Sequence, residues 1–265
     1  MKQSAGNTLK SGTPETIRDN TENLKNISIH VPYTLKPLND KQFEHYLAGL
    51  IDGDGHFSSQ QQLVIVFSSP DVQLAYYIKS IIGFGNVKQV KDKNAYLYII
   101  SNKDGMLKVI SLINGKLRTS NKFYQVINNI LAHSRYSKES IEFKMNNNSS
   151  DFQNHWVAGF ADADASFQIT IINKNNRAKP EIRLTFQIDQ SDKNILFSIK
   201  DLFGGNIGYR DSQNTYYYGS TSFRSAKKVI HLFWYIFHLQ SSKSLINYLK
   251  WRKHTYWYKK TPFNE

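Results

Sequence analysis

Apolar residues recur at helical spacing in a segment between Phe43 and Ile51. Asn39 and Asp40 come directly before it, and both residue types can cap the N-terminus of a helix. The spacing therefore predicts a helix from about Asp40 to residue 52, ending at the glycines that follow.

This helix belongs to an internal repeat. Residues 46–55, YLAGLIDGDG, align with residues 156–165, WVAGFADADA, at an offset of 110, and ordered matches continue as far as Ser120 and Ser241. Two copies of one domain explain that order. We expect an N-terminal arm over residues 1–38, a first domain over 39–134, a linker over 135–148 and a second domain over 149–265.

Strand patterns follow each predicted helix. In the second copy, apolar and polar residues alternate over 167–171 and 182–188, which predicts a hairpin with one apolar face and one polar face. The corresponding hairpin of the first copy is shorter, because 17 rather than 28 residues separate the acidic motif from the next aligned aspartate.

The rest of each copy predicts a helix, a second strand pair and another helix. The expected ranges are 71–82, 86–91 with 95–101, and 105–117 in the first copy, and 192–203, 206–210 with 215–221, and 225–239 in the second. Each half is therefore predicted as α-β-β-α-β-β-α. The expected fold class is α+β, with two pseudo-symmetric domains that each contain an antiparallel sheet.

Small residues lie four apart on the paired helices, at Gly49 and Gly53 and again at Gly159 and Ala163. Residues at this spacing share one helix face. Small side chains on such a face allow close approach, so we expect the two helices to pack on each other about a pseudo-twofold axis.

Asp54 and Asp164 occupy equivalent positions at the C-terminal ends of these helices. A helix C-terminus carries roughly half a negative charge, so two acids at two adjacent ends require a cation. The chain has no cysteine, and oxygen ligands alone favour Mg²⁺. A structural turn role would suffice for either aspartate alone, but the repetition favours a metal site for phosphodiester hydrolysis.

Composition supports a nucleic-acid partner. Lys and Arg total 34 against 21 Asp and Glu, giving a net charge of +13, which favours a polyanion. The absence of cysteine excludes disulfides, Cys-ligated zinc and thiol catalysis. No apolar run approaches the ~18 residues of a membrane span, and no secretory or transit signal is recognised. We therefore expect no membrane association and action where the protein is made.

Residues 47–55, LAGLIDGDG, closely resemble the signature of the LAGLIDADG homing endonucleases. Residues 157–165, VAGFADADA, resemble the second copy found in single-chain members, and the resemblance covers about residues 40–255. It implies a monomer whose two signature helices pack together and whose curved sheets form a DNA-binding saddle. It also implies site-specific double-strand cleavage leaving 3′ overhangs, in intron homing.

The resemblance is to fungal mitochondrial intron-encoded enzymes, so the implied location is the mitochondrial matrix, with translation in the organelle. Mg²⁺ is the implied cofactor; Mn²⁺ is expected to substitute, and Ca²⁺ to bind without cleavage. The implied catalytic residues are Asp54, Asp164, Lys122, Lys243 and Gln190, and the implied metal site also includes Gly53 and Ala163.

Two departures from symmetry stand out. The first-half partner of Gln190 is expected to be Ser69, which predicts two active sites of unequal rate. Ala165 stands where the first copy has Gly55. If that position required a positive φ, alanine would cost about 1 kcal/mol and weaken the second site.

The polar faces of the strands are expected to read DNA through base edges and phosphates. The candidates are Lys88, Lys91, Lys93, Tyr96, Gln168, Thr170, Lys174, Arg177, Arg183, Thr185, Gln187, Arg210, Tyr216 and Tyr218. Fewer base contacts are expected beside the shorter first hairpin. Two alternatives remain open: an RNA maturase that binds its host intron, and a DNA-binding protein without catalysis.

Overall fold

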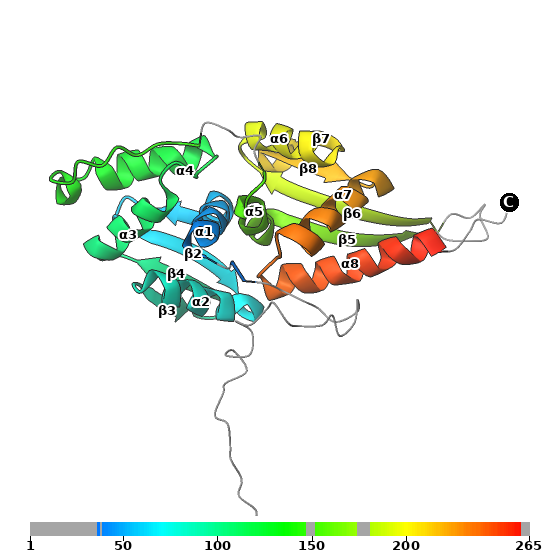
Figure 1. The fold of residues 1–265 in the computed structure, drawn as a ribbon, viewed down its shortest axis with the longest axis horizontal. Coiled ribbons are helices and arrows are strands. Elements are labelled where there is room, and N and C mark those ends of the chain that lie inside the picture. The colour runs from blue at the N-terminus through cyan, green and yellow to red at the C-terminus, as the bar shows by residue number, and fades with distance from the viewer. Residues whose placement is uncertain (1–35, 38, 147–151, 174–180, 261–265) are drawn as a thin grey trace, which may run out of the picture. The chain divides into compact units, whose positions relative to one another are not determined.

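The computed structural model describes residues 36–37, 39–146, 152–173 and 181–260 (Figure 1). The chain divides into a unit of residues 1–33, which lies outside the described residues, and a unit of residues 34–265. The described residues all belong to the second unit. The predicted bounds of arm, linker and domains stay predictions. We call residues 39–134 the first half and residues 149–265 the second half.

The elements follow the predicted order in both halves. The first half contains α1 (Asp40–Asp54), β1 (Gly55–Phe57), β2 (Leu63–Ser68), α2 (Val72–Ile82), β3 (Asn86–Gln89), β4 (Ala95–Ile100), α3 (Lys103–Ile113), α4 (Ser120–Gln125) and the π-helical η3 (Val126–Leu131). The second half contains α5 (Trp156–Asp164), β5 (Ala165–Ile172), β6 (Glu181–Gln190), α6 (Lys193–Phe203), β7 (Asn206–Arg210), β8 (Thr215–Ser220), α7 (Phe223–His231), the π-helical η6 (Leu232–Ile236) and α8 (Ser242–Lys260). Short 3₁₀ turns cover Ser69–Asp71, Ser134–Tyr136 and Asp211–Gln213.

Some boundaries differ from the expectation. The helix predicted over 105–117 is α3, which ends at Ile113, and the one predicted over 225–239 is α7 continued by η6. Each half also contains a further helix, α4 or α8, that the hydrophobic pattern did not predict. The α+β class with two pseudo-symmetric halves is confirmed.

Each half forms one antiparallel four-stranded sheet, in the orders β1-β2-β4-β3 and β5-β6-β8-β7. Ile65 pairs with both Gly55 and Tyr98, while Ile188 pairs with both Ala165 and Tyr218. Ile65 and Ile188 are therefore equivalent positions. Counting along the strands from them gives the correspondence of the remaining strand residues of the two sheets.

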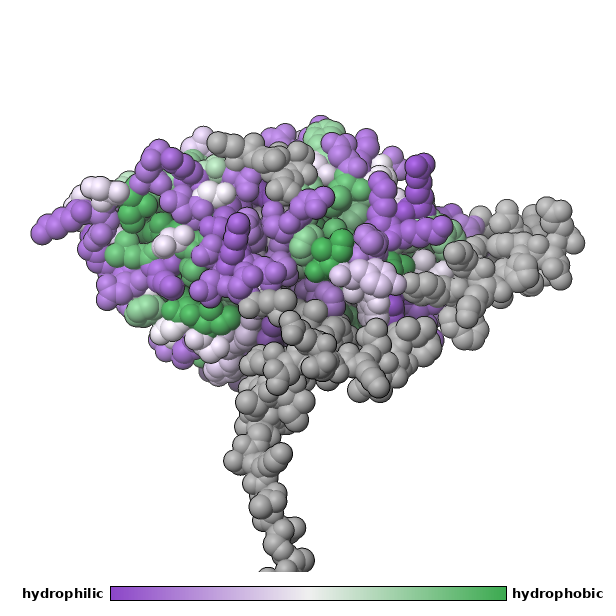
Figure 2. All heavy atoms as spheres, viewed as in Figure 1, coloured by the Kyte–Doolittle hydropathy of each residue, from purple (hydrophilic) through white to green (hydrophobic). Residues whose placement is uncertain are grey.

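Helices cover one face of each sheet, and the core lies between them. Leu63, Ile65 and Phe67 of β2 are buried, whereas Val66 between them is exposed. We call the face opposite the helices the open face of each sheet. On the side of the molecule seen in Figure 2, hydrophilic side chains predominate, with separate apolar patches between them.

The signature helices α1 and α5 lie side by side at the centre (Figure 1) and contact each other through their backbones. A Cβ atom added to Gly49 would overlap the Trp156 carbonyl oxygen and lie 2.9 Å from the Phe160 nitrogen. A Cβ atom added to Gly159 would overlap the Tyr46 carbonyl oxygen. The small residues therefore determine how closely the halves approach, as their spacing predicts.

Gly49→Ala is expected to lower the free energy of unfolding by about 3 kcal/mol, the upper end for overpacking, because the new methyl group meets rigid backbone rather than a movable side chain. The roughly 1 kcal/mol gained in helix propensity cannot offset this. Gly219→Ala is the control, since its Cβ would meet only the Tyr217 ring, at 3.9 Å. Urea unfolding measures both; equal stability of the two variants would contradict the close approach.

Candidate active site and DNA-binding surface

The two signature helices end at Asp54 and Asp164, which form the last residue of α1 and of α5 rather than following them. The carboxylate of Asp164 reaches across to the partner helix, because a Cβ atom on Gly53 would lie 3.1 Å from Asp164 Oδ2. Gly53 and Ala163 meet at the same level, where that Cβ atom would overlap the Ala163 methyl group. The sequence-predicted acidic pair is thus brought together.

The electrostatics of the pair are unfavourable without a cation. Asp54 is open to solvent, yet the surrounding protein excludes enough water to raise its pKa to about 6. Burial, followed by the negative charge of Asp54, raises the pKa of Asp164 to about 8. Burial therefore makes the charged form of each carboxylate less favourable than in water, and at neutral pH it leaves Asp164 mostly protonated unless positive charge joins it.

Two lysines supply part of that positive charge. Lys122 of α4 donates a hydrogen bond from Nζ to the Gly55 carbonyl oxygen at 2.5 Å. Lys122 and Lys243, the latter on α8, both oppose the rise in the pKa of Asp54. Burial lowers the pKa of Lys122, while the charges of Asp164, Asp52 and Asp54 act in the opposite direction. Both predicted lysines therefore lie in the electrostatic field of the acids.

We call α4 and α8, which carry Lys122 and Lys243, the lysine helices. Asp52 holds the segment that leads into the first of them, α4. This fully buried carboxylate accepts hydrogen bonds from the backbone nitrogen of Arg118 at 2.8 Å and from the backbone nitrogen and hydroxyl of Thr119 at 3.1 and 2.6 Å. It also accepts one from the Trp156 indole of the partner helix at 2.8 Å. Burial raises the pKa of Asp52 to about 6, although these four donors oppose the rise.

Asp162 holds the segment that leads into α8 in the second half. Its carboxylate accepts a hydrogen bond from the Gln240 nitrogen at 2.7 Å, just before α8, and one from the Tyr46 hydroxyl of the partner helix at 2.8 Å. Burial raises the pKa of Asp162 to about 7. Asp52 and Asp162 therefore position the helices that carry Lys122 and Lys243.

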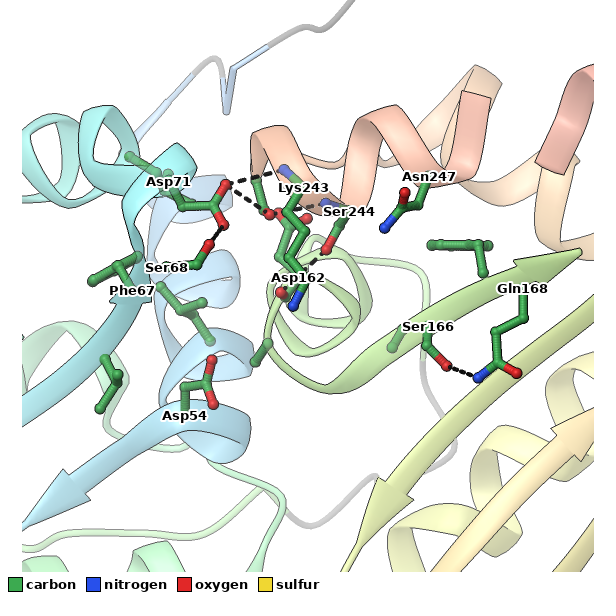
Figure 3. A pocket seen from close by; sticks show the side chains of 17 residues that line it. Asp54, Phe67, Ser68, Asp71, Asp162, Ser166, Gln168, Lys243, Ser244 and Asn247 are labelled. Carbon is green, nitrogen blue, oxygen red and sulfur yellow. Dashed lines mark hydrogen bonds between the residues drawn. The ribbon is translucent and has the colours of Figure 1, made fainter. Parts of the chain in front are cut away.

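Each lysine helix is also held by the opposite half. Asp71 of the first half accepts hydrogen bonds from the Ser241 hydroxyl at 3.0 Å and from the backbone nitrogen of Lys243 at 3.2 Å, at the start of α8 (Figure 3). Asp192 of the second half accepts one from the Ser120 hydroxyl at 3.2 Å, at the start of α4. The repeat aligns Asp71 with Asp192, but their capping across the halves had no sequence signal.

Gln190 contacts a catalytic candidate directly, since its amide donates a hydrogen bond to Asp164 Oδ2 at 2.8 Å. Its expected partner Ser69 is wrong. Gln190 pairs with Tyr216 and Phe67 pairs with Tyr96, so the register makes Phe67 the counterpart of Gln190. The alignment failed here because the first half has two more residues between its strand and the following aspartate.

The concern about Ala165 is removed by its backbone conformation. Gly55 has φ −75° and Ala165 has φ −83°, both extended, so no positive φ is required. Close packing explains the glycine instead, because a Cβ atom on Gly55 would lie 2.7 Å from the Ile51 Cα atom and 2.8 Å from both its carbonyl oxygen and its Cγ2 atom. The second half has Ala161 at the position of Ile51, which removes the Cγ2 contact but not the two contacts with the backbone.

A cavity of about 410 Å³ lies beside Asp54, between the end of α1 and the start of α8 (Figure 3). Val66, Phe67, Gln168 and Lys243 are among its lining residues. Within the described ranges, no three His, Cys, Asp or Glu side chains gather into a metal cage. Two carboxylates still fit Mg²⁺, which takes one or two from the protein and keeps water and substrate phosphate as its other ligands.

Most of the predicted DNA-reading residues lie on the open faces or the turn beside them. By strand register these are Lys88, Gln168, Thr170, Arg183, Thr185, Gln187 and Arg210, with Lys91 and Lys93 exposed in the β3–β4 turn. Lys174 and Arg177 lie outside the described residues. No described helix is both long and apolar enough to cross a bilayer.

Three tyrosines were assigned to the wrong face. Tyr218 is fully buried, and Tyr96 and Tyr216 pack against the core on the helix-covered face, where Lys193 of α6 lies 5.3 Å from the Tyr216 ring centroid. Alternation alone does not say which phase faces the core. Tyr217 is the tyrosine of β8 that faces outward, with Arg210 5.1 Å from its ring centroid.

A family model described as LAGLIDADG endonuclease matches residues 47–133 and 157–255, one copy in each half. The chain belongs to the LAGLIDADG endonuclease family. Both matches begin within the signature helices, at the first residue of each nine-residue motif.

Curated relatives differ in name and length. An "Uncharacterized cox1 intron-2 37.2 kDa protein" of Schizosaccharomyces pombe is 60% identical over 252 residues, 94% of this chain and 76% of that protein. A "Probable intron-encoded endonuclease 4" of Neurospora crassa is 30% identical over 67% of this chain and 35% of its own length. An "Intron-encoded RNA maturase bI4" of Saccharomyces cerevisiae is 28% identical over 76% of this chain and 30% of its own length.

Solved structures share the fold at low identity. The meganuclease I-AabMI, bound to uncleaved DNA, has a TM-score of 0.62 and 19% identity, covering 81% of this chain and 92% of that one. The LAGLIDADG homing endonuclease I-LtrWI, bound to target DNA, has a TM-score of 0.64 and 20% identity, covering 83% of this chain and 92% of that one.

Without divalent cations, the free energy of unfolding of this LAGLIDADG protein is expected to fall as pH rises from about 4 to about 8. Asp164 has a pKa of 3.8 when unfolded and about 8 when folded, so across this range the folded state keeps a proton that the unfolded state has released. Asp162, raised to about 7, adds to the fall. Urea unfolding at several pH values measures the slope.

Asp164→Asn should flatten this slope between pH 6 and 8, and Mg²⁺ should do the same in the unmodified protein. Asp201→Asn, an equal charge change on the exposed side of α6, is the matched control. A slope that neither Asp164→Asn nor Mg²⁺ changes would contradict the raised pKa of Asp164.

Proposed function

We propose that this protein is a site-specific double-strand DNA endonuclease that acts in intron homing, hydrolyses phosphodiesters with a divalent metal and leaves 3′ overhangs. The observation that carries the proposal is the pair Asp54 and Asp164 at adjacent helix ends, with Lys122 and Lys243 in their field. A protein that only bound RNA would have no need of this arrangement.

Asp54 and Asp164 are the residues that would hold Mg²⁺, and Gly53 and Ala163 adjoin them at the same level of the two helices. Bound there, the metal would polarise the scissile phosphate, activate a water and stabilise the leaving oxygen. The fit rests on two carboxylates at adjacent helix ends. Burial raises the pKa of each, so a bound cation would stabilise their charged forms. Mn²⁺ should replace Mg²⁺, and Ca²⁺ should support binding alone.

The chain's own side chains would do the positioning. The Lys122 ammonium group, held against the Gly55 carbonyl oxygen, would stabilise negative charge developing on the phosphate. Lys243 would act equivalently, since its helix is tethered by Asp71. Gln190 would orient the Asp164 carboxylate through its 2.8 Å hydrogen bond.

The two open faces would hold a long asymmetric duplex, and a single chain would act as a monomer because its halves already supply both acids. The net charge of +13 favours phosphate contacts, and the exposed Lys88, Lys91 and Lys93 are placed to make them. The cox1 intron relative supports synthesis and action in mitochondria, with the matrix as the proposed location.

RNA maturase activity, with host intron RNA as partner, is the second candidate, favoured by the name of the Saccharomyces cerevisiae relative. A catalytically inactive DNA-binding role has lost its only sequence hint, because Ala165 adopts the same extended backbone as Gly55. Cleavage, splicing and binding assays on one preparation separate the three.

Asp54→Asn and Asp164→Asn are each expected to reduce cleavage in Mg²⁺ more than about 100-fold, since each removes a ligand charge and even outer-shell changes cost 10–100-fold. The substrate is duplex DNA spanning the intronless insertion site. Affinity in Ca²⁺, measured by mobility shift, should change little because the basic residues of the open faces, rather than the two carboxylates, would supply most of the phosphate contacts.

Asp201→Asn is again the matched control and should cleave normally. Tight DNA binding without cleavage by the unmodified protein would reject the nuclease. Stimulated splicing of the precursor RNA without DNA binding would identify a maturase instead. Full activity in either active-site variant would refute the metal assignment.

The two strands are expected to be cut at unequal rates, because Asp164 has the Gln190 amide while the first half has buried Phe67 at that position. A nicked intermediate should accumulate on a supercoiled plasmid carrying the target. Gln190→Leu should slow one strand several-fold and spare the other. Equal rates for both strands, or equal slowing of both by Gln190→Leu, would contradict this asymmetry.

A further inference from the structure

The centre of the first open face is apolar. Val64 and Val66 of β2 lie opposite Ile99 and Leu97 of β4, so four aliphatic side chains form one group, which we call the apolar patch. Val66 is 46% exposed, and the other three are partly exposed. This composition is the reverse of what a DNA-reading sheet needs for hydrogen bonds.

The apolar patch does not belong to the core. Its neighbours along the strands, Leu63, Ile65, Tyr98 and Ile100, are completely buried and face the helices. Successive strand residues point to opposite faces, so the patch points away from them. None of its four residues is among the described side chains that pack against the core.

The second sheet is polar at the same register positions. Gln187 and Asp189 of β6 correspond to Val64 and Val66, while Tyr217 and Gly219 of β8 correspond to Leu97 and Ile99. Gln187 donates to Asp189 at 2.9 Å, and Arg210 pairs with Asp189 at 3.1 Å. One open face thus presents an ordered set of hydrogen-bonding groups, and the other presents methyl groups.

Basic residues border the apolar patch. Lys88 lies beside Leu97 on the neighbouring strand, and Lys91 and Lys93 are exposed in the adjoining turn. An apolar centre with a cationic edge suits duplex DNA, where phosphates flank the base edges. In the major groove, the one apolar group that a base presents is the C5-methyl of thymine.

We infer that the first sheet recognises its half of the target through thymine methyl groups, whereas the second sheet uses hydrogen bonds. This inference rests on the proposed DNA-binding function. RNA fits the patch poorly, because uracil lacks the methyl group and the major groove of A-form RNA is too narrow for side chains to read. The target is therefore asymmetric in chemistry, with thymines concentrated in one half-site.

The target is obtained first, by selecting duplexes from a randomised DNA library with the full chain in Ca²⁺. Consecutive A·T pairs are expected in one half-site. Deoxyuridine then replaces thymine in one half-site at a time, which removes only the methyl groups. Affinity should fall about fourfold per contacted thymine, as for one buried methylene, in that half-site alone; the other half-site is the internal control.

Val66→Thr ties the effect to the protein. It keeps the branched shape at an exposed position but replaces a methyl group by a hydroxyl, so the penalty for deoxyuridine should shrink at one thymine. Ile81→Thr, on the exposed side of α2, is the matched control and should keep the full penalty.

The outcomes separate the two proposals. Failure to enrich any duplex would reject the proposed DNA function itself. An enriched duplex that is insensitive to deoxyuridine in both half-sites would overturn the inference alone. Concentration-dependent self-association that Val66→Thr abolishes would also overturn it, by showing that the apolar patch is a protein interface.

Discussion

The close approach of α1 and α5 is the constraint on which the rest of the site depends. Gly49 and Gly159 each face the partner helix's carbonyl oxygen with no room for a methyl group, so the two backbones meet directly. This contact brings the helix ends together, and with them Asp54 and Asp164. A helix pair separated by ordinary side chains would be 8–10 Å apart between axes, and the carboxylate of Asp164 would no longer reach Gly53.

The same contact buries two further carboxylates, those of Asp52 and Asp162, and their hydrogen bonds join the helix pair to neighbouring segments. Asp52 and Asp162 each bond an aromatic group of the partner helix and the backbone before a lysine helix. Burying a carboxylate is costly unless donors satisfy it, so these aspartates fix both the helix pair and the lysines relative to one another. The active-site acids receive no comparable set of donors, and a cation remains the way to balance them.

Much of this organisation was predictable because it repeats. The offset of 110 between two acidic motifs predicted the helix pair and its site, and alternation predicted the hairpins. The failures have physical causes. A fixed offset paired Gln190 with Ser69 because a turn differs in length, and alternation without a known core face misplaced Tyr216 and Tyr218. The caps by Asp71 and Asp192 cross between halves, and no local pattern specifies such contacts.

The symmetry and asymmetry of the molecule lie on different elements. Helix positions keep equivalent residues, since Asp54 matches Asp164 and Lys122 matches Lys243, and the backbone contact allows few alternatives there. Strand positions diverge, as Phe67 against Gln190 and Val66 against Asp189 show. Side chains on an open sheet face do not support the helix pair, so they can change without moving the carboxylates. A duplicated scaffold can therefore acquire two unlike surfaces while retaining one arrangement of acids and lysines.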